Sequence, residues 1–150
     1  MTGPSPGIGA YIKRINDYLA REANRNLKAL NLTRTQCHLL MALYHQPNHA
    51  ASLKEMETLF QVAQPTMAGI AARLEVKLLV ESFFDPRDRR VKHLRLTDEG
   101  QRLCLAAHEG ILATERQLAA ALTPQEQAQF RQLLQRVHAS IQDNPQDSPL

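Results

Sequence analysis

The sequence lacks several features that would assign it to familiar classes of protein. It has no tryptophan, and aromatic residues make up only 5% of its 150 residues, which weakens any interpretation based on bases or sugars stacking on aromatic side chains. Its two cysteines, Cys37 and Cys104, are too few for a disulfide scaffold and are expected to be reduced. Apolar residues make up 43% of the chain, which is enough for one buried core.

Membrane and enzyme signatures are missing as well. No apolar run approaches the roughly 20 residues that span a bilayer, and residues 1–7 do not have the basic and apolar regions of a signal peptide. We therefore expect a cytoplasmic protein with no membrane partner. The chain also has no glycine-rich phosphate loop, no nucleophile elbow and no acidic cluster for Mg²⁺. We expect neither an enzyme nor a bound cofactor.

Most of the sequence patterns in this chain predict helices. Apolar residues recur at helical spacing from Ile8 to about Leu30. Capping boxes at Thr33–Gln36 and Ser52–Glu55, in which two side chains satisfy the first free amides, predict two short helices. Pro65 suits the first position of a helix because its missing N–H would be unpaired there, and it predicts a third short helix to about Lys77.

The pattern then changes to two short strands. The segments Val80–Phe84 and Val91–Leu96 are rich in β-branched and apolar residues and predict a β-hairpin with a polar turn. Residues 85–95 hold five basic residues against two aspartates, which accounts for the net charge of +3 of the whole chain. Two longer helices are predicted after the hairpin, at 97–122 and, from a third capping box, at 123–142.

This order of elements is typical of a winged helix-turn-helix. The major groove of B-DNA admits one α-helix, and a second helix braces it. The cationic tip of a neighbouring hairpin can then reach phosphates or the minor groove. At the start of the third short helix, Gln64 can pair with adenine, Thr66 can donate to a phosphate or base, and Met67 can contact a thymine methyl. A solvated loop and ordinary cap residues are the alternative explanation of these positions.

Several motifs follow one another along the chain: Leu32-Thr33-Arg-Thr-Gln36, Gln64-Pro65-Thr66, Arg73-Leu74-Glu75, and Asp85-Pro-Arg-Asp-Arg-Arg90 followed by Leu96-Thr97-Asp-Glu-Gly100. In this order and at these distances, they resemble the MarR family of bacterial winged-helix transcriptional regulators. The resemblance covers roughly residues 32–141. The combination of the last two motifs is the most specific part of it.

The resemblance implies a mainly α fold with a small β-hairpin wing. It divides one domain, residues 1–150, into a winged helix-turn-helix DNA-binding lobe at 32–96, dimerisation helices at 8–31 and 97–142, and tails at 1–7 and 143–150 that we expect to be disordered. It implies a homodimer on double-stranded operator DNA of palindromic sequence. The long apolar stripes support a dimer independently, because one small lobe cannot cover all of them.

The resemblance also implies roles for single residues. The arginine matching Arg90 enters the minor groove, and Asp88 helps to orient it, often through a recognition-helix arginine such as Arg73. The candidate DNA-binding residues are Gln64, Thr66, Met67, Arg73, Arg87, Asp88, Arg89, Arg90 and Lys92.

The sequence departs from the family pattern inside the third short helix and at both of its ends. Ala63 replaces a capping serine, Gly69 replaces a larger polar residue, and Leu78 replaces a helix-ending glycine. The only charges between residues 64 and 76 are Arg73 and Glu75, which cancel. We therefore expect the wing to dominate phosphate contact, with an affinity that is modest or sharply dependent on salt.

The sequence is compatible with several stimuli to which such a regulator could respond. The resemblance implies a ligand-responsive repressor that binds a small aromatic or anionic effector. Zinc is an alternative, because Cys37, His38, Cys104 and His108 offer four ligands of suitable softness; they are explained more simply as small core cysteines and surface histidines. Thiol oxidation at Cys37 or Cys104 is a further alternative. A winged helix used only for protein contact, and non-specific architectural binding of DNA, are the others.

Overall fold

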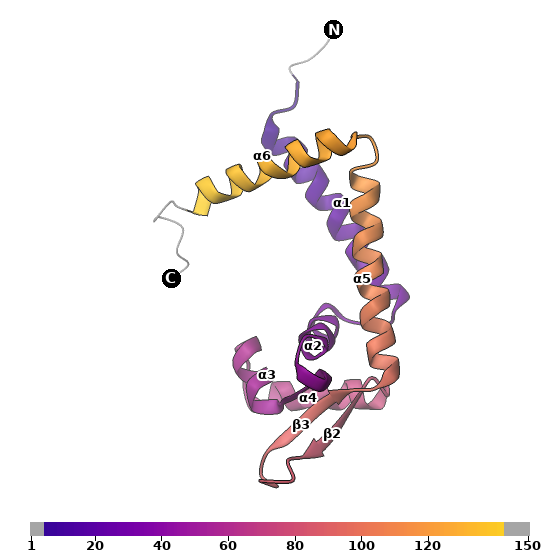
Figure 1. Cartoon of the computed structure of the whole chain (residues 1–150), viewed down its shortest axis with the longest axis vertical. Helices are drawn as coiled ribbons and strands as arrows, with labels where there is room; N and C mark the ends of the chain where they lie inside the picture. The colour runs from indigo at the N-terminus through magenta and orange to yellow at the C-terminus, as the bar shows by residue number, and fades with distance from the viewer. Residues whose placement is uncertain (1–4, 143–150) are drawn as a thin grey trace. The chain divides into compact units, whose positions relative to one another are not determined.

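The computed structural model describes residues 5–142 of the chain, and most of them are helical (Figure 1). The elements are α1 (Ile8–Ala29), α2 (Arg34–Tyr44), the short 3-10 helix η1 (Pro47–His49), β1 (Ala50–Ser52), α3 (Leu53–Phe60), α4 (Gln64–Val76), β2 (Val80–Phe84), β3 (Lys92–Leu96), α5 (Asp98–Leu118) and α6 (Pro124–Gln142). They form two compact units, divided within α5 between Leu112 and Ala113. Of the tails expected to be disordered, residues 1–4 and 143–150 lie outside the described residues, and Ser5–Gly7 are exposed.

Two helices of the first unit begin at the predicted capping boxes. The Thr33 hydroxyl accepts a hydrogen bond from the Gln36 amide at 3.1 Å, and Gln36 Oε1 accepts one from the Thr33 amide at 3.2 Å. Ser52 and Glu55 make the same reciprocal pair at the start of α3, at 3.1 and 2.7 Å. Because each box satisfies two amides that the helix leaves free, the predicted starts of α2 and α3 are confirmed.

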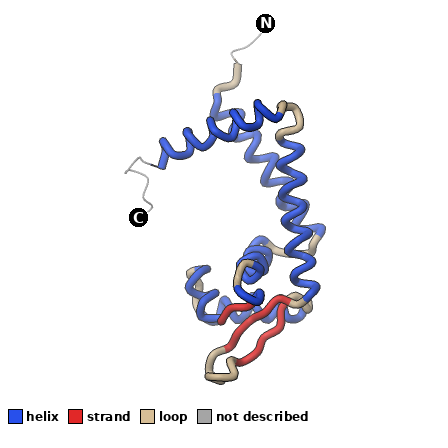
Figure 2. Tube along the Cα trace, in the orientation of Figure 1, coloured by secondary structure: helices blue, strands red, loops and turns tan. Residues whose placement is uncertain are grey.

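The strands form a small antiparallel sheet in the order β1–β3–β2. β2 and β3 are the predicted hairpin, with Val80 opposite Leu96 and Phe84 opposite Lys92. Figure 2 shows the loop of this hairpin extending beyond the helices of the first unit. β1 was not predicted, because a strand of three residues is too short to show an alternating pattern. It pairs with the other edge of β3, so that Ala51 lies opposite Leu94.

The core of the first unit lies where α2, α3 and α4 pack on one another and on the sheet. The largest fully buried side chains are those of Leu39, Leu40, Leu43, Met56, Met67, Leu74 and Leu94. Burial of each such side chain contributes roughly 1.5–3 kcal/mol relative to leaving it exposed. This packing fixes α4 along its inner face and leaves its other face to solvent.

The junction between α4, the hairpin and α5 is closely packed. Leu78 has a φ of 59°, in the left-handed region, which costs a leucine about 1 kcal/mol. Its carbonyl oxygen accepts a hydrogen bond from the Thr97 hydroxyl at 2.7 Å. A Cβ atom at Gly100 would lie 2.1 Å from the carbonyl oxygen of Leu79, so the backbones meet where only glycine fits. The base of the hairpin is therefore anchored to both flanking helices.

The second unit contains the end of α5 and all of α6. α5 ends at Leu118 rather than at about Leu122, and α6 begins at the predicted capping box, where Thr123 and Glu126 bond at 3.2 and 2.8 Å. The apolar residues of α6 recur at helical spacing and are all exposed: Phe130, Leu133, Leu134, Val137 and Ile141. No helix in the described part of the chain is both long and apolar enough to cross a membrane.

Candidate nucleic-acid interface

The N-terminal end of α4 is open to solvent. Ala63 occupies the cap position and makes no side-chain capping hydrogen bond. Gln64, Pro65 and Thr66 follow it and are all exposed. The start of a helix carries a partial positive charge, because the dipoles of its peptide units add. Gln64 and Thr66 are therefore available to a ligand that approaches this end of the helix.

The structure corrects the expectation for Met67. Its side chain is completely buried, at 0% exposure, and belongs to the hydrophobic core with Ala71 and Leu74. These three residues follow the inner face of α4 at helical spacing. Met67 therefore stabilises the helix against the body of the unit and cannot contact a thymine methyl.

Two aspartates shape the turn of the hairpin. The Asp85 carboxylate accepts a hydrogen bond from the Arg87 amide at 2.8 Å, and the Asp88 carboxylate accepts one from the Arg90 amide at 3.1 Å. The backbone closes with bonds from the Asp85 amide to the Val91 oxygen at 2.9 Å and from the Val91 amide to the Asp88 oxygen at 3.0 Å. Such local bonds are what makes aspartate common in turns.

Asp88 also holds the side chain of Arg90. Arg90 Nε donates to Asp88 Oδ1 at 3.0 Å, and Arg90 Nη2 donates to Oδ2 at 3.2 Å. The hydrogen bonds from the Arg90 side chain and amide lower the pKa of the Asp88 carboxyl from its ordinary value. Asp88 and Arg90 are thus brought together as expected, but directly. Among the described residues no hydrogen bond joins Arg73 to them, and Arg73 lines a depression with Gln36 and Val76. The intermediary role of Arg73 stays a prediction.

The remaining basic residues of the hairpin differ in their freedom. Arg95 is committed, because its Nη2 lies 2.8 Å from Glu81 Oε1 and its guanidinium lies 4.8 Å from the centre of the Phe83 ring. Arg87, Arg89 and Lys92 are exposed, and no ion pair between described residues involves them. These three cations are therefore available to neutralise phosphates.

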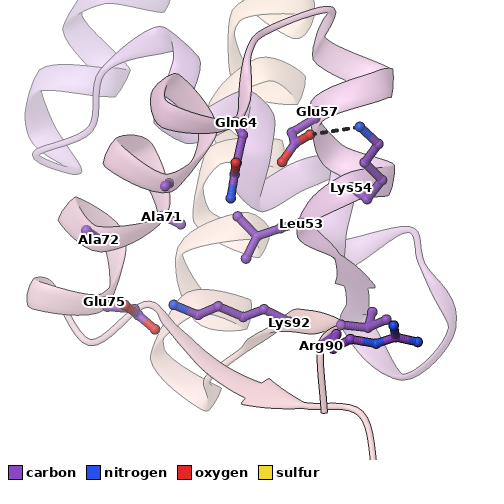
Figure 3. A pocket seen from close by; sticks show the side chains of 11 residues that line it. Leu53, Lys54, Glu57, Gln64, Ala71, Ala72, Glu75, Arg90 and Lys92 are labelled. Carbon is purple, nitrogen blue, oxygen red and sulfur yellow. Dashed lines mark hydrogen bonds and ion pairs between the residues drawn. The ribbon is translucent and has the colours of Figure 1, made fainter. Parts of the chain in front are cut away.

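A groove of about 480 Å³ connects the hairpin to the helix-turn-helix (Figure 3). It runs between α3, α4 and the start of β3, and its charged and amide residues are Lys54, Glu57, Gln64, Glu75, Arg90 and Lys92. Gln64 and Lys92, predicted separately, line the same groove. Arg90 lines it too, so the wing and the start of α4 face one ligand-sized space.

Sequence reasoning missed Lys54. Its ammonium pairs with Glu57 at 3.5 Å, and its side chain is 85% exposed whereas that of Glu57 is only 11% exposed. An exposed ion pair contributes about 1 kcal/mol or less, so Lys54 can exchange this partner for a phosphate. The sequence feature that could have identified Lys54 was its position just after the Ser52 cap, at the start of the helix that precedes α4.

The candidate metal and redox residues do not form a site. Among the described residues no three or more His, Cys, Asp or Glu side chains gather as a metal site, and His38 and His108 are exposed. Burial raises the pKa of the Cys37 thiol. Burial, and secondarily the neighbouring Cys37, raise the pKa of Cys104 to about 11. Because the thiolate is the reactive form, both cysteines are poorly suited to oxidation sensing at neutral pH.

A second cavity lies within the first unit, between α1, α2 and α5. Its volume is about 400 Å³. Its lining is mostly apolar, with Leu19, Leu27, Leu30, Met41 and Ile111 among its residues, and its polar residues are Asn16, Asn26, Arg34 and His38. An apolar cavity with a few polar groups is typical of sites for small molecules.

Comparisons with known proteins agree with this geometry. Residues 32–92, from α2 to the start of β3, match the model of the MarR family. YxaD, an uncharacterized HTH-type transcriptional regulator of Bacillus subtilis, is 33% identical over 93 residues, which cover 62% of this chain and 65% of YxaD. This chain therefore spans just under two thirds of that relative. MprA, a transcriptional repressor of Escherichia coli, is 28% identical over 132 residues, which cover 86% of this chain and 73% of MprA.

Solved structures share the fold. In a complex of S. aureus MepR with DNA, the MepR chain is 24% identical and has a TM-score of 0.79, with 89% of this chain and 98% of that chain covered. YusO from Bacillus subtilis is 23% identical and has a TM-score of 0.82, with 88% and 92% covered. At these identities the likeness establishes the fold, and the argument for function depends on the site.

Proposed function

Because residues 32–92 match the model of the MarR family, we propose that the protein is a member of this family and a sequence-specific, double-stranded DNA-binding regulator of transcription. In this proposal it acts as a homodimer at a pseudo-palindromic operator, represses transcription, and loosens from DNA when a small ligand binds. Its place of action is the cytoplasm, where bacterial DNA lies. The relatives YxaD and MprA are both named as transcriptional regulators, which agrees with the expectation that the chain is not an enzyme.

One observation carries the DNA-binding proposal: exposed wing cations and the exposed start of α4 border the same groove of the first unit. Gln64, Arg90 and Lys92 line one groove, and Arg87 and Arg89 extend the cationic surface along the turn. A helix fits the major groove, and arginines beside it reach phosphates or the adjacent minor groove. A winged helix used only for protein contact does not need this cationic turn.

The homodimer is supported by apolar surface that each unit leaves exposed. In α1, Ile8 is 80% and Ile12 is 50% exposed, and in α6 the five apolar residues named above face solvent. Contiguous apolar surface on a folded protein is typical of an interface. A twofold dimer would bury the same surface on both copies and would match two half-sites about one helical turn apart.

A relative supports the proposed repression, and a cavity supports the proposed response to a ligand. MprA of Escherichia coli is named a transcriptional repressor. The cavity between α1, α2 and α5 combines apolar walls with the guanidinium of Arg34. This lining suits a small apolar or aromatic molecule with an anionic group, because arginine binds carboxylates and related anions well.

The test begins with selection of binding sites from random double-stranded DNA by the full-length protein, followed by fluorescence anisotropy on the selected site. Replacement of Arg89 and Arg90 by alanine is expected to weaken binding at least about hundredfold and to lower the slope of log affinity against log salt by about 2. The control replaces Arg21 and Arg102 by alanine. This double substitution removes the same charge from other exposed helix positions and should leave the affinity for DNA nearly unchanged.

The selection and the titration together separate the alternatives. A protein-contact module would enrich no DNA sequence at all. An architectural protein would bind every duplex equally at fixed salt. Wild-type affinity in the Arg89 and Arg90 double variant would contradict the proposed interface.

A further inference from the structure

Lys77 joins the end of α4 to a distant part of the chain. It is the C-cap residue of α4, and its ammonium donates hydrogen bonds to the main-chain oxygen of Asn31 and, at 3.1 Å, to Gln36 Oε1. Asn31 lies in the connection between α1 and α2, and Gln36 lies in the first turn of α2. One lysine thus bridges segments more than forty positions apart in the sequence.

Both acceptors of Lys77 are held in place by other contacts. Gln36 is buried, at 5% exposure, and its Oε1 already accepts from the Thr33 amide in the capping box. Asn31 has a φ of 53°, in the left-handed region that asparagine tolerates. The Leu32 amide after it donates to the Leu27 oxygen at 3.0 Å. Lys77 therefore binds a preformed pair of oxygens, and a charged donor makes these bonds stronger than neutral ones.

No other side chain of α4 or its caps makes such a link. Among the described residues, the side-chain hydrogen bonds of Lys77 are the only ones from α4 and its cap residues to the rest of the unit. The core contacts of α4 are apolar, made by the buried Met67, Ala71 and Leu74 and the partly buried Ile70. Apolar packing holds the helix to the core but is less directional than hydrogen bonding. Among the described side chains of α4 and its caps, Lys77 therefore makes the one directional contact with the rest of the unit.

The α1–α2 junction is also the wall of the cavity between α1, α2 and α5. Leu27 and Arg34 line that cavity, and both also line the shallow depression that contains Asn31 and Lys77. A displacement of α1 against α2 at the cavity would move the oxygens to which Lys77 is bound. Contacts therefore run without a break from the wall of the cavity, through the α1–α2 junction, to Lys77 at the end of α4.

We propose that Lys77 is a positioning residue that ties the orientation of α4 to the α1–α2 junction and, through it, to the neighbouring cavity. This inference rests on the proposed function for its meaning, because the orientation of α4 determines how its exposed start meets a DNA groove. Lys77 itself need not touch DNA.

The experiment uses the full-length variants K77M and K77R, with K28M as the control. Lys28 is exposed, lines the same depression, and makes no side-chain hydrogen bond in the described structure, so K28M removes an equal charge nearby. Without DNA, K77M is expected to speed amide hydrogen exchange about tenfold at residues 30–36 and 74–79 together, as expected for loss of a charged hydrogen bond. K77R should restore slow exchange, because its guanidinium can also reach two acceptors.

Affinity for the selected operator gives the second measurement. K77M should bind about tenfold more weakly than wild type, with K77R and K28M close to wild type. The slope of log affinity against log salt should not change in K77M, whereas loss of a phosphate contact would lower it by about 1.

Each outcome decides between the possibilities. Unchanged exchange in K77M at either segment would overturn the tie itself, whether or not the protein binds DNA. Faster exchange at both segments with unchanged affinity, or a lowered salt slope, would overturn the positioning role. Failure of the wild-type protein to enrich any DNA sequence would instead overturn the proposed function, and the exchange data would still judge the tie.

Discussion

At the residue scale, the aspartates of the wing determine where its arginines lie. Asp88 binds both the amide and the guanidinium of Arg90, while Asp85 holds the amide of Arg87. An arginine that is held before binding loses less conformational entropy when it binds. Arg95 shows the opposite use of an acid, because Glu81 and Phe83 keep it on the sheet.

A pH titration tests the pair between Asp88 and Arg90. The hydrogen bonds from Arg90 hold the pKa of the Asp88 carboxyl below its ordinary value of 3.8. Since the folded-state pKa is lowered, the contribution of the pair is present above the unfolded pKa and is lost as the pH falls through the folded pKa. NMR of the carboxyl carbon should give a midpoint below 3.8 in the wild type. In R90A the midpoint should rise; an identical midpoint in both proteins would refute the pairing in solution.

At the element scale, local chemistry made the helix starts predictable. A capping box lies within four consecutive residues, so Thr33, Ser52 and Thr123 could be identified without knowledge of the fold. The hairpin was visible for a similar reason, because its alternation and its polar turn are contiguous. β1 could not be found, since its three residues are a strand only by virtue of pairing with β3.

The residues whose roles the sequence did not reveal depend on long-range packing. Met67 was assigned to the DNA because the inner face of α4 cannot be identified without its neighbours. Lys54 enters the site through a groove that three separate elements form. Lys77 was read only as the end of a helix, and its partners Asn31 and Gln36 lie far away in sequence. Most of the fold and the wing were predictable, but the face that α4 presents was not.

Two glycines of α4 and α5 should respond to alanine in opposite ways. A Cβ at Gly100 would meet the Leu79 oxygen at 2.1 Å, whereas nothing lies within 4 Å of one at Gly69. Gly100→Ala should therefore lower the free energy of unfolding by about 3 kcal/mol or prevent folding. Gly69→Ala should raise it by about 1 kcal/mol, because alanine favours a helix interior. Urea denaturation measures both, and equal effects of the two substitutions would contradict the described packing.

At the scale of the whole molecule, the apolar face of α6 is exposed and is covered by none of the described residues of its own unit. None of the described residues of α6 is buried, although helices of globular proteins gain most of their stability from packing an apolar face. The proposed second copy would supply that packing. Operator recognition by two symmetric lobes would then depend on residues that never approach DNA.

Charges on this face should separate the copies. Replacement of Leu134 and Val137 by glutamate is expected to halve the molar mass measured by light scattering at micromolar concentration, because two carboxylates resist burial in an apolar interface. Operator affinity should fall at least about tenfold, since one lobe then binds without the other. The control places glutamate at Gln132 and Gln135 of the same helix, which should leave the dimer intact. A dimeric mass in the Leu134 and Val137 variant would argue against this interface.

The concentration of positive charge in the hairpin affects the approach of the protein to DNA as well as its contacts in the complex. Residues 85–95 account for the whole net charge of +3, so the rest of the chain is electrically neutral. The excess positive charge is therefore concentrated at the wing, and the field of a polyanion attracts that end of the molecule, which exerts a torque on it. Over a range of about 8 Å at physiological ionic strength, that torque would turn the hairpin toward the duplex during approach. Productive collisions would then be favoured before any atom of the two partners has met.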